Sequence, residues 1–237
     1  MFENERYEWM SDLNVGVTFV TWFFCFFIVG LYLIGGSITW IVTWKTKSEL
    51  VYKDLFKELN EDNGFNDIKI VSAKKGLRMP FFNYNPLTKE FQVKPWELER
   101  QNLASILNLF FSYVLIIETR VQNTHYRRSL LWMTSLNILA LFLGLISFLI
   151  VLITPYGLSD ATLQWFDFSL QIINYFAMGL IFISWISLAF IYESLGKLMN
   201  EMAVHYLSPE KFKRFRAVVG VYAFIPLIKN PFLITKL

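Results

Sequence analysis

The stretch VKPWELERQNLASILNLFFSYVLIIE, residues 93–118, decides the fold of this chain. A helix-start signal stands at Lys94-Pro95, and 17 uncharged residues then separate Arg100 from Glu118. In one continuous helix over this stretch, neighbours at i+3 and i+4 share a face. The pattern therefore predicts a central helix, apolar nearly all round and surrounded by protein or lipid. Its polar side chains form one narrow stripe: Gln101, Ser105, Asn108 and Ser112.

The composition around this stretch is that of a membrane protein. Of the 237 residues, 55% are hydrophobic, and the chain has 24 Phe and 8 Trp. Three uncharged spans exceed the roughly 20 residues needed to cross a bilayer. They lie between Asp12 and Lys45, between Arg128 and Asp160, and between Asp167 and Glu193. We therefore expect a mainly α-helical membrane protein with three clear transmembrane helices.

The charge distribution predicts the orientation. Residues 45–129 contain 14 Lys or Arg, whereas residues 1–14 contain one Arg against four acids. The positive-inside rule then places the N-terminus outside and the central segment in the cytoplasm. Acidic residues are interspersed with the basic ones, and the sequence has no Arg-rich stripe accompanied by aromatic residues on which bases could stack. Both observations argue against nucleic-acid binding. The expected partners are the lipid bilayer and another membrane protein or a peptide.

These patterns divide the chain into segments. We expect an extracytoplasmic tail (1–14), a first transmembrane helix (15–44), a cytoplasmic α/β segment (45–93), the central helix with a basic linker (94–128), a second transmembrane helix (129–154), an extracytoplasmic loop (155–165), a third transmembrane helix with a cytoplasmic extension (166–207), and a C-terminal helix that is partly membrane-embedded (208–237).

The α/β segment has the texture of a soluble domain. Apolar residues recur at helical spacing over 48–59, and Gly64 is placed to end that helix. Residues 67–72 alternate with period two and predict a strand, and residues 81–94 predict a hairpin around Pro86. The result is a small hairpin-containing segment that is too short to be stable without the helices beneath it.

Groups for catalysis or metal binding are scarce. The only histidines are His125 and His205, so no HExxH pair of imidazoles can form on one helix face. Glu201 and His205 are spaced i,i+4 and, with Glu193, are weak candidates for a metal site, which needs three protein ligands. A Glu–His surface contact is the simpler interpretation. The one cysteine, Cys25, lies in an apolar span, and the sequence predicts no cofactor.

The order of elements resembles that of the YugP-type bacterial membrane neutral zinc metallopeptidases. That family has an anchor helix, an α/β segment with a hairpin, a helix that carries HExGHA, a basic linker and further membrane helices. Here NYNPLTKEFQV (83–93) resembles the family's turn and strand, and RSLLWM (128–133) resembles the stretch that follows the catalytic helix. LSPE (207–210) resembles the late turn before the last helix.

The resemblance implies that the zinc site has been lost. Ungapped placement puts Phe111 and Leu115 at the family's two histidines and Ser112 at its glutamate. None of these three side chains ligates zinc or serves as the usual base, and the later acidic ligand falls near Phe190 or Glu193. The leading hypothesis is thus a pseudopeptidase that serves as a binding or scaffold protein in the bacterial cell membrane.

Two alternatives remain open at this point. One is a membrane hydrolase with a non-family site, which requires Glu193, Glu201 and His205 to converge. The other is a small structural membrane subunit. For the polar stripe, helix–helix hydrogen bonding is the favoured interpretation, and a cleft that binds an extended peptide is the alternative.

Overall fold

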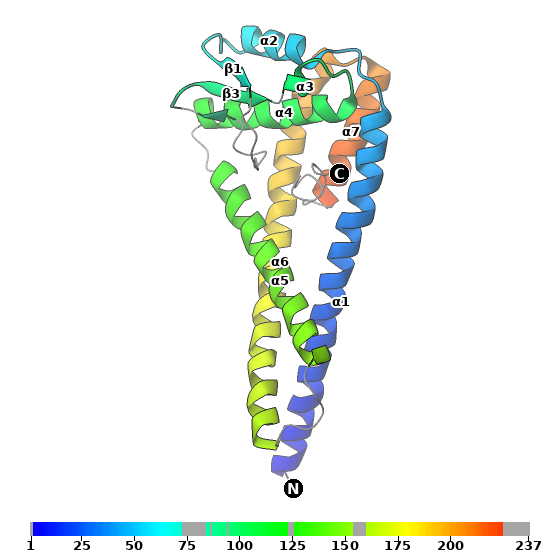
Figure 1. Ribbon diagram of the computed structural model, residues 1–237, viewed down its shortest axis with the longest axis vertical. Coiled ribbons are helices and arrows are strands. Elements are labelled where there is room, and N and C mark those ends of the chain that lie inside the picture. Colours follow the sequence, from blue (N-terminus) through cyan, green and yellow to red (C-terminus); the bar gives the residue numbers. More distant parts are fainter. Residues whose placement is uncertain are drawn as a thin grey trace. The chain divides into compact units, whose positions relative to one another are not determined.

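The computed structural model of the chain describes residues 2–72, 84–85, 87–93, 95–122, 126–153 and 160–224, which are mainly helical. The long helices are α1 (Phe2–Lys45), α5 (Tyr126–Ile153) and α6 (Asp160–Tyr206) (Figure 1). The shorter helices are α2 (Tyr52–Asp62), α3 (Pro95–Leu98), α4 (Leu103–Ile117) and α7 (Pro209–Phe224). A π-helical turn, η2 (Glu118–Gln122), follows α4, and the strands are β1 (Lys69–Ser72), β2 (Tyr84–Asn85) and β3 (Glu90–Val93).

The chain divides into two compact units. We call one the bundle unit, which comprises Met1–Leu31 and Trp132–Ser187. The other is the cap unit, which comprises Tyr32–Leu131 and Leu188–Leu237. The cap unit therefore contains the strands, α2, α3, α4, η2 and α7, together with the last parts of α1 and α6 and the start of α5.

Three stretches of the described helices are long and apolar enough to cross a membrane: Leu103–Arg120, Arg128–Ile150 and Phe168–Tyr206. A shorter apolar stretch, Gly16–Leu31, lies in α1. In the most apolar part of each stretch, the buried share is 72% for the first but only 33% and 28% for the other two. Apolar surface left bare on α5 and α6 is unfavourable in water and favourable in lipid. The chain is thus compatible with a multi-pass membrane protein in which α4 is packed mainly against protein.

Within the bundle unit, a chain of hydrogen bonds joins α1, α5 and α6. Trp22 Nε1 donates to Ser147 Oγ at 3.2 Å, and Ser147 Oγ donates to Asn174 Oδ1 at 2.8 Å. Asn174 Nδ2 in turn donates to Thr18 Oγ1 at 3.2 Å. Ser147 and Asn174 are buried. Polar side chains inside an apolar bundle stabilise it when they are paired in this way.

Helix α2 follows the predicted pattern. Its buried face is formed by Tyr52, Leu55, Phe56 and Leu59, at the i, i+3, i+4 and i+7 spacing of an amphipathic helix. Gly64 follows the end of the helix with a φ of 68°, a left-handed conformation that costs glycine little, and its N–H donates to the Glu61 carbonyl at 3.3 Å. The prediction that Gly64 ends this helix is confirmed.

The sheet has the order β1-β3-β2, with β1 parallel and β2 antiparallel to β3. Tyr84 pairs with Phe91, and Ile70 pairs with Phe91 from the other side. The ring of Phe91 is fully buried and stacks on Phe56 of α2 at 5.1 Å, so the sheet is attached to the helix. Both predicted strand regions therefore contain strands, although residues 81–83, 86 and 94 of the predicted hairpin lie outside the described residues.

The prediction of one helix over residues 94–118 is wrong. The chain forms the single turn α3, then runs extended through Asn102, and α4 begins at Leu103. Backbone pairing explains the break: Ser48 N donates to the Gln101 carbonyl at 2.7 Å, and Leu103 N donates to the Thr46 carbonyl at 2.9 Å. The Asn102 side chain then caps α4 by accepting from Ser105 N at 2.9 Å.

The third predicted span and its extension form one helix. Expected over residues 166–207, this helix runs as α6 from Asp160 to Tyr206 without interruption. Helix α7 begins at Pro209, as the Ser208-Pro209 sequence predicts. The hydroxyl of Ser208, directly before the helix, donates to the Glu49 carboxylate at 3.2 Å. The C-terminal helix predicted over residues 208–237 forms α7 as far as Phe224, and its remainder lies outside the described residues.

Candidate functional site

The positions that the resemblance assigns to the zinc site lie on α4 and are buried. Phe111 is 1% exposed, Ser112 is 6% exposed and Leu115 is 5% exposed. The Phe111 ring stacks on Tyr192 of α6 with centroids 6.1 Å apart and planes at 17°. Aromatic stacking of this kind is a core contact. These three side chains therefore serve as packing residues in the cap unit.

The residues at these positions do not fit a zinc ion. Phenylalanine and leucine offer no donor atom, and zinc in proteins is held by Cys, His, Asp or Glu. Among the described residues, no group of three or more such side chains is arranged to hold a metal ion. His125 lies outside the described residues.

The predicted polar stripe is divided by the structure. Gln101 precedes α4, is exposed, and uses its backbone carbonyl to pair with Ser48. Asn108 is also exposed, whereas Ser105 and Ser112 are buried. The four residues therefore do not share one surface, because the helix begins after Gln101 and its buried face excludes Asn108.

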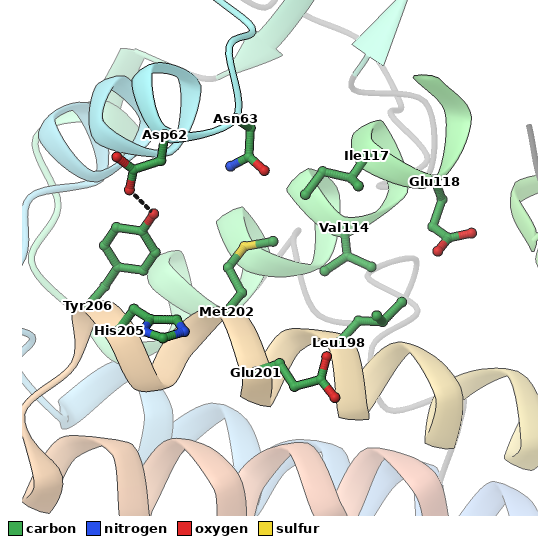
Figure 2. Close-up of a pocket in the computed structure, with 10 residues that line it drawn as sticks. All are labelled: Asp62, Asn63, Val114, Ile117, Glu118, Leu198, Glu201, Met202, His205 and Tyr206. Atoms are coloured by element: carbon green, nitrogen blue, oxygen red, sulfur yellow. Dashed lines mark hydrogen bonds between the residues drawn. The ribbon is translucent and has the colours of Figure 1, made fainter. Parts of the chain in front are cut away.

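A pocket of about 530 Å³ lies in the cap unit, where the ends of α2 and α4 face the last turns of α6. Figure 2 shows α6 on one side of the pocket and the other two helices opposite it. Four apolar side chains line it: Val114, Ile117, Leu198 and Met202. The volume is in the range of sites for small molecules.

Six polar residues complete the lining of this pocket: Asp62, Asn63, Glu118, Glu201, His205 and Tyr206. Three of them carry carboxylates, and neither Lys nor Arg is among the lining residues. The Tyr206 hydroxyl donates to Asp62, and Glu118 is only 3% exposed although it lines the pocket. In Figure 2 the carboxylates of Asp62 and Glu118 lie on opposite sides, and that of Glu201 lies between them on the α6 side. The pocket is thus acidic around an apolar surface.

The three weak candidate ligands on α6 do not converge. Glu201 and His205 both line the pocket, one turn apart. Glu193 is not among the lining residues, and its carboxylate pairs with Lys197 at 3.0 Å. A separation of twelve residues along a helix places Glu193 roughly 18 Å from His205. The alternative that needs all three side chains in one cleft therefore lacks its geometric basis.

Arg120 holds the end of α4 to the sheet. Its guanidinium donates to Asp67 through two bonds, of 2.7 and 3.0 Å, and its Nε donates to Tyr84 at 2.7 Å. Lys89 completes the group, with its Nζ 2.7 Å from Asp67. The hydrogen bonds from Arg120, and then those from Lys89, hold the pKa of Asp67 well below its usual range. We call Arg120, Asp67, Tyr84 and Lys89 together the clamp.

The lowered pKa of Asp67 predicts that the stability of the cap unit depends on pH. A carboxyl whose pKa is lowered on folding stabilises the fold above its unfolded pKa of roughly 3.9, and this contribution is lost as the pH falls through the folded value. We expect Asp67→Asn to lower the melting temperature at pH 7 and to match the wild type increasingly as the pH falls below about 4. Thermal melts followed by circular dichroism check this.

A matched control is Glu99→Gln, which removes an exposed carboxylate with no salt bridge among the described residues. Glu99→Gln should leave the melting temperature unchanged both at pH 7 and at pH 3. A difference between Asp67→Asn and the wild type that is as large at pH 3 as at pH 7 would contradict the assigned role of the Asp67 charge.

Most of the pocket was not predicted from the sequence. Glu201 and His205 carried a signal in their i,i+4 spacing, but Asp62, Glu118 and Tyr206 lie far apart in the sequence. The available clues were indirect: Gly64 fixes the end of α2 next to Asp62, and Glu118 ends the uncharged run of the central stretch. Neither clue indicates that the two helix ends face the same side of α6.

Comparison of the chain with protein-family models, with curated proteins and with solved structures gives no match.

Proposed function

We propose that this chain is a catalytically silent relative of the YugP-type zinc metallopeptidases and acts as a binding or scaffold protein in the bacterial membrane. In this proposal the N-terminus is outside the cell, and the α/β segment of the cap unit faces the cytoplasm, where binding takes place. The excess of basic residues in that segment supports the orientation.

The observation that carries the proposal is the burial of α4. Twelve of its fifteen residues are buried, which leaves almost no face on which to present catalytic groups. Phe110 contacts Phe215 of α7 at 5.3 Å, and Tyr113 donates to the Leu59 carbonyl of α2 at 2.7 Å. Side chains on α4 thus join elements from most of the cap unit, which is a structural role.

The arrangement of the hairpin supports descent from the family. A family-like arrangement requires the hairpin to be held against the central helix. Tyr84 of β2 accepts from Arg120, just after α4, and Phe91 of β3 stacks on Phe56, whose ring meets Tyr113 of α4 edge-on at 6.1 Å. The hairpin is therefore linked to both the end and the middle of α4.

The binding role is tested by site-specific photo-cross-linking in native membranes. Leu87, in the turn before β3, is 92% exposed and is a suitable position for a photo-reactive residue. We expect a discrete adduct with another polypeptide from position 87, and only lipid adducts from Phe142, which is 59% exposed in the apolar part of α5.

Failure of position 87, and of exposed positions such as Lys53 on α2, to give a polypeptide adduct would contradict a binding role for the cap unit. So would an equal yield of the same adduct from Phe142, because capture would then reflect crowding in the bilayer.

A further inference from the structure

The acidic pocket of the cap unit has a lining that selects for charge. Asp62, Glu118 and Glu201 come from the ends of α2 and α4 and from α6, and no Lys or Arg lines the pocket with them. An anion would meet three carboxylates there without a lysine or arginine to offset them, and a neutral donor would form weaker hydrogen bonds with these carboxylates than an ammonium group would. A cation is therefore the favoured occupant.

The arrangement of the carboxylates argues against a single metal ion. Asp62 and Glu118 lie on opposite sides of the pocket, with Glu201 between them (Figure 2). In agreement, the described residues contain no group of three His, Cys, Asp or Glu side chains that could hold a metal. A volume of about 530 Å³ also suits an organic molecule rather than an ion.

The apolar part of the lining defines the rest of the ligand. In Figure 2 the side chains of Val114, Ile117, Leu198 and Met202 lie between the carboxylates of Asp62 and Glu118. A polymethylene chain loses unfavourable contact with water when it lies on such a surface. Ammonium groups at the two ends of such a chain are the groups that form charge-assisted hydrogen bonds with carboxylates.

We propose that this pocket binds a linear aliphatic diamine or polyamine, with its ammonium groups at the carboxylates of Asp62, Glu201 and Glu118 and its methylene chain over the apolar surface. This goes beyond the scaffold role proposed above. The pocket residues are distinct from Phe111, Ser112 and Leu115, and the photo-cross-linking test uses neither the pocket nor an amine, so the two proposals can fail independently.

The test is calorimetric titration of the full chain in nanodiscs of phosphatidylcholine, whose lack of net charge limits amine adsorption to lipid. The probes are 1,6-diaminohexane, n-hexylamine and 1,6-hexanediol, which share a six-carbon chain. We expect the diamine to bind about tenfold more tightly than hexylamine, as one additional charge-assisted hydrogen bond provides, and the diol not to bind.

The variant Glu201→Gln should weaken diamine binding about tenfold, by loss of one such bond. Glu201 is exposed, so this change leaves the fold intact. Its matched control is Glu193→Gln, the same change on the same helix but outside the pocket, which should have no effect. Absence of diamine binding, equal affinity for diamine and hexylamine, or equal loss in the two variants would overturn the proposal.

Discussion

Alanine at position 144 is expected to destabilise the bundle unit by about 2 kcal/mol, the usual cost of forcing an extra group into a packed interface. Gly144 on α5 faces Cys25 on α1, and a Cβ added there would lie 2.3 Å from Cys25 Sγ. Real Cβ contacts are never so short, so the sulfur must rotate or the helices must separate. The free energy of unfolding, measured by SDS titration in mixed micelles, checks this.

Two further variants isolate the cause. Cys25→Ala removes the sulfur and leaves the Cys25 Cβ 3.6 Å from the added atom, an ordinary contact, so the double variant should recover most of the loss. Gly179→Ala on α6 is the matched control, because nothing lies within 4 Å of its added Cβ. If Gly144→Ala were as stable as Gly179→Ala, helices α1 and α5 would not approach each other at this point.

Leucine at position 174 should have a comparable effect, on the order of 2 kcal/mol, because it removes the centre of the hydrogen-bond chain. The Asn174 side chain accepts a hydrogen bond from Ser147 at 2.8 Å and donates one to Thr18 at 3.2 Å, and Asn174 is only 1% exposed. Leucine has the same number of side-chain heavy atoms, branches at the same carbon and is somewhat larger, so the loss does not come from a cavity. The same SDS titration measures it.

Thr134→Val serves as the control for burial of a polar group. The Thr134 hydroxyl is buried without a hydrogen-bond partner among the described residues, so its removal should be neutral or stabilising. Equal destabilisation by Asn174→Leu and Thr134→Val would show that any polar-to-apolar change perturbs the bundle, and would contradict a specific role for the Trp22–Ser147–Asn174–Thr18 chain.

The elements of the fold that depend on local pattern were predictable. The periodicity of residues 48–59 predicts α2, which begins at Tyr52, and Gly64 fixes its end, because these signals act within a few residues. Charge-free spans predict α5 and α6 for the same reason. The separation of α3 from α4 was not predictable, since the helix is interrupted by pairing of Gln101 and Leu103 with Ser48 and Thr46, some fifty residues away.

The site was predictable only where its residues share one helix. Glu201 and His205 are one turn apart, so their presence on one face follows from helix geometry. The contribution of Asp62 and Glu118 depends on how α2 and α4 pack on α6, and that packing rests on contacts such as Tyr113 with Leu59 and Phe111 with Tyr192. Single apolar residues carry no signal that identifies such partners. In the bundle unit, likewise, the sequence carries no signal that identifies Ser147 and Asn174 as hydrogen-bond partners.

The most direct test of a silent pseudopeptidase is the zinc content of the chain after purification from membranes without chelators, measured by elemental mass spectrometry alongside a peptide-cleavage assay. Because Phe111, Ser112 and Leu115 are packed into the core of the cap unit, we expect substoichiometric zinc, unchanged in His205→Ala, and no cleavage that responds to added zinc. One tightly bound zinc per chain that is lost in His205→Ala, together with zinc-dependent cleavage, would contradict this account.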